Sequence, residues 1–113
     1  MINERLTVER LADARFYAEE VYRIASQSDA RTSSNDHLAI RYCLVVIGET
    51  LGRVPTPIFA DEVMIPWSRI IGLRHRLVHG YWLIDADIID EIARHETQPL
   101  ITALDRLIEK LKA

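Results

Sequence analysis

The chain has 113 residues, the length of one domain, and we treat residues 1–113 as a single domain. Hydrophobic residues make up 49% and charged residues 27% of the chain, which excludes a disordered protein and is typical of a globular one. The net charge of −3 argues against a protein that covers a long track of nucleic-acid phosphates.

Cysteine content and hydropathy set the expected compartment. The single cysteine, Cys43, excludes an internal disulfide, and its apolar neighbours from Tyr42 to Ile47 predict a buried, unreactive thiol. No segment approaches the roughly 20 apolar residues that a membrane span needs, and the first five residues lack the apolar stretch of a secretory signal. We therefore expect no membrane contact and a reducing, cytoplasmic location.

Apolar residues recur at spacings of three and four, without the alternation of strands, so the sequence predicts helices throughout. The first helix is expected from about Thr7, as its N-cap, to Ser26, with Phe16 among its apolar positions. The second is expected from about Asp36 to Gly52, capped by Asn35. It is apolar nearly all round, which favours a central position or a subunit contact.

Two prolines, Pro55 and Pro57, end the second helix, and a connection with a short helical turn is expected over Thr56–Ile65. Pro66 is typical of a first helical position, so the third helix should run from there to about His79 and end at Gly80.

Two further helices complete the predicted fold. The fourth should start at Asp85 or Asp87 and run to about His95, and the fifth should be capped by Thr97. The sequence thus predicts an all-α, antiparallel bundle of four to five helices. A chain this short buries a limited core, which favours a second copy that completes it.

Basic residues gather in one part of the sequence. The stretch 63–84 contains no acidic residue and holds three arginines and two histidines, whereas all 17 carboxylates lie outside it. Such a local positive patch on an acidic protein suits a polyanionic ligand bound at one site.

One arginine of the third helix lies where apolar residues are expected. At about 100° per residue, Arg74 falls in the middle of an apolar arc, formed by Trp67, Ile70, Ile71, Leu77 and Val78. A guanidinium is costly to bury alone, so Arg74 must pair with a carboxylate or face a cleft. The candidate partner is Glu49, the one acid inside the apolar second helix.

The opposite arc carries His75 and His79, four residues apart on one face. That spacing suits zinc, but the glutamate of the metalloprotease helix and a further cysteine are missing, so we expect two surface histidines and no metal. His79 also lies in the last helical turn, where the helix dipole favours its protonated form and acid–base chemistry.

An arginine and a histidine suffice for metal-free RNA cleavage. Arg74 would bind the phosphate and its transition state, and His79 would take the proton of a ribose 2′-hydroxyl or give one to the leaving 5′-oxygen. The two differ by about 140° around one helix, so a second subunit that supplies the facing half improves the geometry.

The surrounding residues resemble a known family. The run from Ile65-Pro66-Trp67 to His79-Gly80-Tyr81 is similar to the signature of small HEPN-domain toxins of the HepT type. That family is marked by an Arg, four to six residues, and His-x-Tyr, which here are Arg74, His79 and Tyr81. Ile47-Gly48-Glu49 resembles the family's Ile-Gly-Glu, and the likeness covers the whole chain in length and helix order.

The resemblance implies a HEPN-like homodimer in which two Arg/His sets face one cleft. It implies a metal-independent endoribonuclease without a cofactor, the toxin of a bacterial toxin–antitoxin pair, with Arg74 and His79 as catalytic residues. The implied partner is an MntA-type nucleotidyltransferase antitoxin that transfers AMP from ATP to Tyr81, adding charge and bulk that repel RNA. Without the resemblance, Tyr81 would be interpreted as a packing residue.

The residue after the arginine is most often Asn in the family, and here it is His75. An imidazole there preserves a polar contact, serves as a second acid–base group, or alters the activity. Together with Glu49, His75 is thus a candidate supporting residue.

Two alternatives remain open from the sequence. One is a non-catalytic HEPN module that docks a nucleotidyltransferase and binds nucleotide or RNA without cutting it. The other is a purely structural helical dimer in which Arg74 and Glu49 form a buried pair.

Overall fold

The computed structural model describes residues 3–27, 34–80 and 86–113, and within these ranges the ordered elements are all helical. They are α1 (Glu4–Gln27), α2 (Ser34–Leu51), the 3₁₀ helix η1 (Thr56–Asp61), α3 (Trp67–Gly80), α4 (Ala86–His95) and α5 (Thr97–Lys112). The predicted all-α fold and the helical turn in the connection are therefore confirmed. In the described part of the chain, none of the helices has the length and apolarity needed to cross a bilayer.

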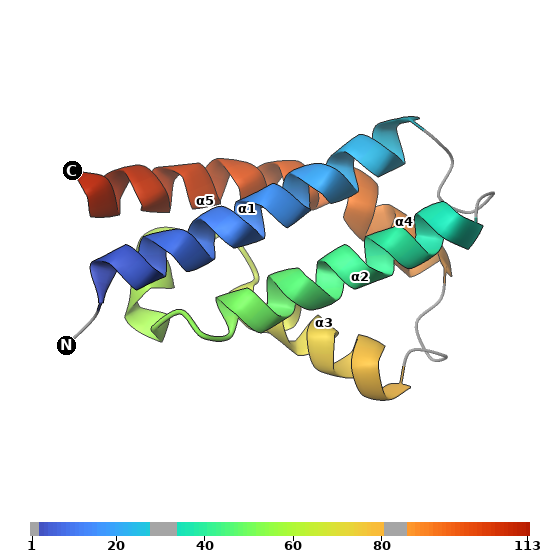
Figure 1. Cartoon of the computed structure of the whole chain (residues 1–113), viewed down its shortest axis with the longest axis horizontal. Helices are drawn as coiled ribbons and strands as arrows, with labels where there is room; N and C mark the ends of the chain where they lie inside the picture. The colour runs from blue at the N-terminus through green and yellow to red at the C-terminus, as the bar shows by residue number, and fades with distance from the viewer. Residues whose placement is uncertain (1–2, 28–33, 81–85) are drawn as a thin grey trace.

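Helix α1 is the central element of the bundle. It packs between α2 and α5, while α3 packs on α2 and the short α4 contacts α1, α2 and α5. Figure 1 shows these helices side by side, with both chain ends at the same end of the molecule and α3 at the outer edge beneath α2. The bundle measures 44 × 28 × 22 Å, and its arrangement leaves α3 open along one side.

The sequence of α1 explains its central place. Its buried positions follow one another at spacings of four and three, which gives one continuous stripe along the helix, formed by Thr7, Leu11, Ala14, Ala18, Val21 and Ala25. Three of the six are alanines, whose small side chains allow neighbouring helices to approach closely. Phe16 was expected on this apolar face, but it is 57% exposed.

Three of the predicted N-caps were wrong, although the helices exist; for the fourth helix, Asp87 lies inside α4 and Asp85 lies outside the described residues. Helix α1 begins one turn before Thr7, because the side-chain Oδ1 of Asn3 accepts a hydrogen bond from the backbone N–H of Leu6 at 3.0 Å. Asn35 lies inside α2, which starts at Ser34. The hydroxyl of Thr97 donates to the carbonyl of Ala93 at 2.9 Å, so it ties α5 to α4 and caps neither. A polar residue before an apolar run thus locates a helix start only to within a turn.

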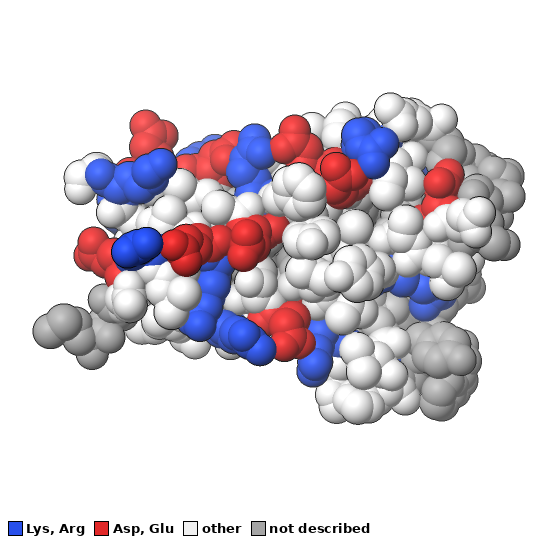
Figure 2. All heavy atoms as spheres, in the orientation of Figure 1, with Lys and Arg blue, Asp and Glu red and all other residues white. Residues whose placement is uncertain are grey.

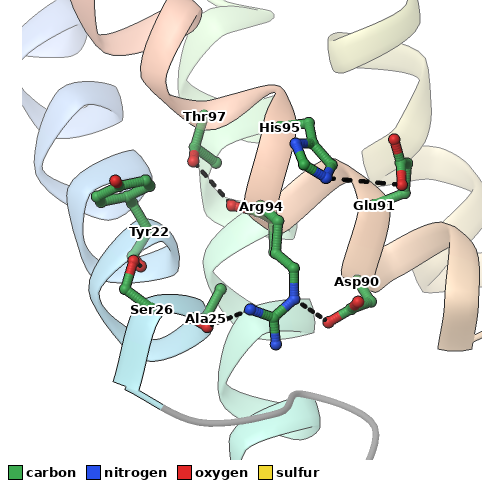
Figure 3. Close-up of polar contacts among 9 residues, drawn as sticks. Tyr22, Ala25, Ser26, Asp90, Glu91, Arg94, His95 and Thr97 are labelled. Carbon is green, nitrogen blue, oxygen red and sulfur yellow. Dashed lines mark hydrogen bonds and ion pairs between the residues drawn. The ribbon is translucent and has the colours of Figure 1, made fainter.

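An arginine of α4 joins the end of α1 to the bundle. Arg94 donates from Nη1 to the backbone oxygen of Ala25 at 2.8 Å and from Nε to Asp90 at 2.9 Å. Figure 3 shows its guanidinium between these two acceptors. The last carbonyls of a helix lack partners within the helix, so this contact satisfies one of them and stabilises the crossing of α1 and α4.

An apolar face remains uncovered on α1 and α2. Phe16, Leu38 and Tyr42 are 57%, 64% and 62% exposed, and Tyr17 links Phe16 to Tyr42 through edge-to-face ring contacts. Figure 2 shows few charged side chains over the neighbouring parts of these two helices. We call these four residues the apolar face; exposed aromatic clusters of this kind mark interaction surfaces.

Helices α2 and α3 meet at a glycine. A Cβ atom added to Gly48 would lie 2.4 Å from Cβ of Arg74, whereas one added to Gly72 would meet nothing within 4 Å. Gly48 is therefore required for the close approach that sets α3, and Arg74 with it, against α2. Because Gly52 faces Ile71 one turn further along, the two helices run antiparallel at this contact.

The two glycines predict opposite stability changes. Gly48→Ala should lower the free energy of unfolding by about 1–3 kcal/mol, because its methyl group overlaps Arg74. Gly72→Ala, at an open helical position, should raise it by about 0.5–1 kcal/mol. Urea unfolding of both variants measures the difference. Equal stability of the two variants would contradict the close contact of α2 and α3.

Candidate functional site

The structure places Arg74 at the edge of the buried face of α3. That face is formed by Trp67, Leu73 and Leu77, which are 9%, 8% and 5% exposed. Val78 was predicted on the apolar arc, but it is 43% exposed, and Leu73 was not predicted there. The buried arc is thus rotated around the helix axis by about 40° from the predicted one, and Arg74 lies where core and solvent meet.

Arg74 is paired with Glu49, as the sequence predicted. Its Nη2 lies 2.8 Å from Oε2 of Glu49, and the two side chains are 38% and 41% exposed. The Nε–H of Arg74 is buried and finds no acceptor within the described residues. Buried donors are almost always satisfied, so this orphan group leaves the contacts of Arg74 incomplete, while the exposed part of its guanidinium stays open to solvent.

Glu49 holds a second guanidinium that sequence reasoning missed. Arg53 Nη2 lies 3.0 Å from Oε1 of Glu49, so each carboxylate oxygen binds a different arginine. Arg10 of α1 approaches from the other side and donates from Nη1 to the backbone oxygen of Arg53 at 2.8 Å. The Glu49–Arg53 spacing of four was visible in the sequence. The contact of Arg10 spans 43 positions and had no local signal.

His75 and His79 lie together on the outer side of α3. Both side chains are exposed, and their ring centroids are 4.7 Å apart. Within the described ranges, no group of three or more His, Cys, Asp or Glu side chains forms a potential metal site. Because both side chains are exposed, the two imidazoles are open to solvent at the end of α3, and His79 occupies its last turn.

Within the single chain, the structure does not bring Arg74 and His79 together. Among the described residues, Arg74 contacts Glu49 on α2, whereas His79 contacts His75 on the opposite side of the same helix. Tyr81, the implied AMP acceptor, lies outside the described residues, which resume at residue 86.

The positive patch predicted over residues 63–84 is partly neutralised. Arg69 forms an ion pair with Glu96, as Arg74 does with Glu49. Of the three arginines in the stretch, only Arg76 has no ion pair within the part of the chain that the structure describes. The charges counted along the sequence therefore overstate the positive charge of this stretch, because glutamates from other parts of the chain pair with two of its arginines.

The single cysteine lies where the sequence predicted. Cys43 is a free thiol, 7% exposed, on the buried side of α2. Burial raises the pKa of the Cys43 thiol, which reduces its nucleophilic thiolate form. It is therefore a core residue.

The fold and this site define a small helical protein whose helix α3 carries a half-exposed arginine on one side and two exposed histidines on the other. A comparison with protein families supports that class directly: the family described as ribonuclease HepT-like matches residues 11–107. The chain belongs to the HepT-like ribonuclease family.

Individual relatives agree with this assignment. A protein of Methanocaldococcus jannaschii named "Putative RNase" is 27% identical over 106 residues, covering 90% of each chain. A second protein of that organism with the same name is 30% identical over 78 residues, covering 66% of this chain and 64% of the relative. A protein of Thermococcus cleftensis named "Probable ribonuclease HepT" is 25% identical over 105 residues, covering 93% of this chain and 92% of the relative. No solved structure matches the chain significantly.

Proposed function

We propose that this protein is the toxin of a toxin–antitoxin system and cleaves RNA internally without a metal ion. The proposal rests on the half-exposed guanidinium of Arg74 in a chain of the HepT-like ribonuclease family. A permanently charged fork with free donors suits the non-bridging oxygens of a phosphodiester.

The cleavage step uses the ribose as its own nucleophile. The 2′-oxygen forms a bond to phosphorus while the bond to the 5′-oxygen breaks, leaving a 2′,3′-cyclic phosphate and a 5′-hydroxyl. In our proposal, His79 takes the 2′-hydroxyl proton or gives a proton to the leaving 5′-oxygen. Arg74 stabilises the extra negative charge on the phosphoryl oxygens as it develops. His75, whose ring lies beside that of His79, supports it as a polar neighbour or second acid–base group.

A homodimer completes this site in our proposal. Leu38, Tyr42 and Val45 follow one another at spacings of four and three, and the same stripe continues to Glu49, which holds Arg74. The apolar face is therefore continuous with the arginine site. A second copy that covers it through two-fold symmetry brings its own α3 to the same cleft, so that Arg74 meets His79 of the partner subunit.

Disrupting the apolar face should separate the subunits. Tyr42→Glu places a charge at the centre of the proposed interface and should yield monomers in light scattering, with helical content unchanged because Tyr42 is 62% exposed. Cleavage should fall in parallel. Met64→Glu, at an 89% exposed apolar residue outside this face, is the control and should remain dimeric. A Tyr42→Glu protein that stays dimeric would contradict the assigned interface.

We further propose that an MntA-type nucleotidyltransferase neutralises the toxin in the cytoplasm by modifying Tyr81. The phenol oxygen of Tyr81 attacks the α-phosphorus of ATP, the phenol proton is lost and pyrophosphate leaves. The position of Tyr81 two residues after His79, together with family membership, supports the assignment. The added phosphate places negative charge where RNA must enter.

Intact mass spectrometry tests this modification. Protein co-expressed with a nucleotidyltransferase from the adjacent reading frame should gain the mass of AMP and lose activity. Tyr81→Phe, which lacks the acceptor oxygen, should gain no mass and escape inhibition. AMP found on the Tyr81→Phe variant would assign the acceptor to another residue.

The ribonuclease proposal is tested with antitoxin-free protein in excess EDTA. We expect cleavage of RNA, 2′,3′-cyclic phosphate ends, and no cleavage of a strand that carries 2′-deoxyribose at the cut position. Tight, salt-sensitive RNA binding without scission would instead support the non-catalytic binding module.

A further inference from the structure

We propose that Arg53, supported by Arg10, binds the RNA phosphate next to the one bound by Arg74. This inference rests on the proposed ribonuclease function and extends it to a second subsite. It starts from the cluster formed by Arg10, Glu49, Arg53 and Arg74, which we call the Glu49 cluster.

The cluster carries a surplus of positive charge. Two guanidiniums pair with one carboxylate, and a third, that of Arg10, donates to the backbone of Arg53. Figure 2 shows basic side chains on either side of an acidic one over the end of α2 and the adjoining part of α3. A carboxylate between two arginines offsets their mutual repulsion and fixes their separation. It thereby keeps two cations side by side in the free protein.

Free donors remain on both arginines. A guanidinium has five N–H groups, and Glu49 engages only Nη2 of Arg53 and Nη2 of Arg74. The Arg53 side chain is 63% exposed, so its remaining donors face solvent. Within the described residues, these donors have no further acceptor. Each arginine can therefore bind a phosphate oxygen while Glu49 holds it.

The backbone of Arg53 is also fixed in place. Arg53 follows the last residue of α2 by two positions, and its backbone N–H donates to the carbonyl of Thr50 at 3.2 Å. The hydrogen bond from Arg10 secures its own carbonyl to α1. Because α2 and α3 run antiparallel, Arg53 lies along α2 on the side of Gly48 toward Gly52 and Ile71. Arg53 and Arg74 thus reach Glu49 from two different elements, the turn after α2 and helix α3, and each pairs with a different oxygen of its carboxylate. Two guanidiniums held apart by one carboxylate suit neighbouring phosphates of one strand.

Salt-dependent RNA binding tests the second subsite without requiring cleavage. The probe is a labelled single strand of about ten nucleotides, fully 2′-O-methylated so that it cannot be cut. For a single strand, removing one phosphate contact lowers the slope of log affinity against log salt by about 0.7. The affinity advantage of the wild type over Arg53→Gln should therefore shrink about five-fold over a tenfold rise in salt.

Two matched variants separate phosphate binding from structure. Arg23→Gln removes an exposed arginine that pairs with a glutamate on its own helix, far along α1 from Arg10, and should keep the wild-type slope. Arg53→Lys keeps the charge and should also keep the slope. A purely structural Arg53 would change thermal stability without changing the slope.

The outcomes distinguish the two proposals. Binding without scission of a natural RNA would remove the ribonuclease function, while the slopes would still decide the role of Arg53. An Arg53→Gln slope equal to that of the wild type, or an equal loss in Arg23→Gln, would overturn the second subsite.

Discussion

Replacing His79 with alanine should reduce RNA cleavage by about 10²–10⁴-fold, the usual contribution of a general acid or base. The fold should persist because the side chain is exposed and, among the described residues, its ring contacts only that of the exposed His75. Cleavage rates under single-turnover conditions, with circular dichroism as the check on folding, measure both effects. RNA affinity should change little, because His79 acts on protons rather than on the phosphate charge.

The matched control is His95→Ala. His95 also ends a helix, has an exposed side chain, and lies 4.0 Å from a glutamate of its own helix. It should leave cleavage unchanged. Cleavage retained in His79→Ala would remove this residue from the mechanism and favour His75 as the acid–base group.

Replacing Arg74 with alanine should lower cleavage by about 10²–10³-fold, as expected for loss of a donor that stabilises transition-state charge. RNA binding should weaken too, because a phosphate contact is lost. Arg74→Lys should recover part of the binding and little of the rate, since an ammonium lacks the planar fork. The measurement is again single-turnover cleavage, with binding followed separately on the 2′-O-methylated strand.

The stability of Arg74→Ala distinguishes a functional arginine from a structural one. The Arg74–Glu49 pair is more than one-third exposed on both sides, so its loss should cost less than about 1 kcal/mol of unfolding free energy. Alanine keeps the Cβ atom that packs on Gly48, and Glu49 keeps Arg53 as a partner. A loss of about 3–5 kcal/mol, typical of breaking a buried pair, would support the structural alternative. Arg69→Ala, which removes an exposed pair elsewhere on α3, provides the reference.

The helices of this fold could be predicted from sequence because hydrophobic periodicity reports burial directly. The heptad-like stripe of α1 and the stop at Pro55 are examples. Helix ends were less predictable: Thr7 and Asn35 are typical caps, yet α1 starts one turn earlier after a cap formed by Asn3, and α2 starts at Ser34. Val78 was placed inside for a similar reason: periodicity gives the width of a buried arc but not its rotation relative to neighbouring helices.

The candidate site was predictable only where one residue conflicted with its surroundings. Arg74 lies in an apolar arc and Glu49 in an apolar helix, so each was predicted to be the partner of the other. The structure confirms this ion pair. Nothing in the sequence distinguishes Arg53 from other surface arginines. It becomes a candidate site residue only because the structure places it on the carboxylate that also binds Arg74. Arg10 joins the site through a contact between distant parts of the chain, which no local pattern encodes.

Mixed dimers test most directly whether two chains build one cleavage cleft. Arg74→Ala and His79→Ala subunits, each inactive alone, are co-expressed with different tags so that heterodimers form. Such a heterodimer retains one intact Arg74 facing one intact His79 of the partner subunit, so a random mixture should recover up to about a quarter of wild-type cleavage in EDTA. A mixture that stays as inactive as its components would contradict a cleft shared between subunits.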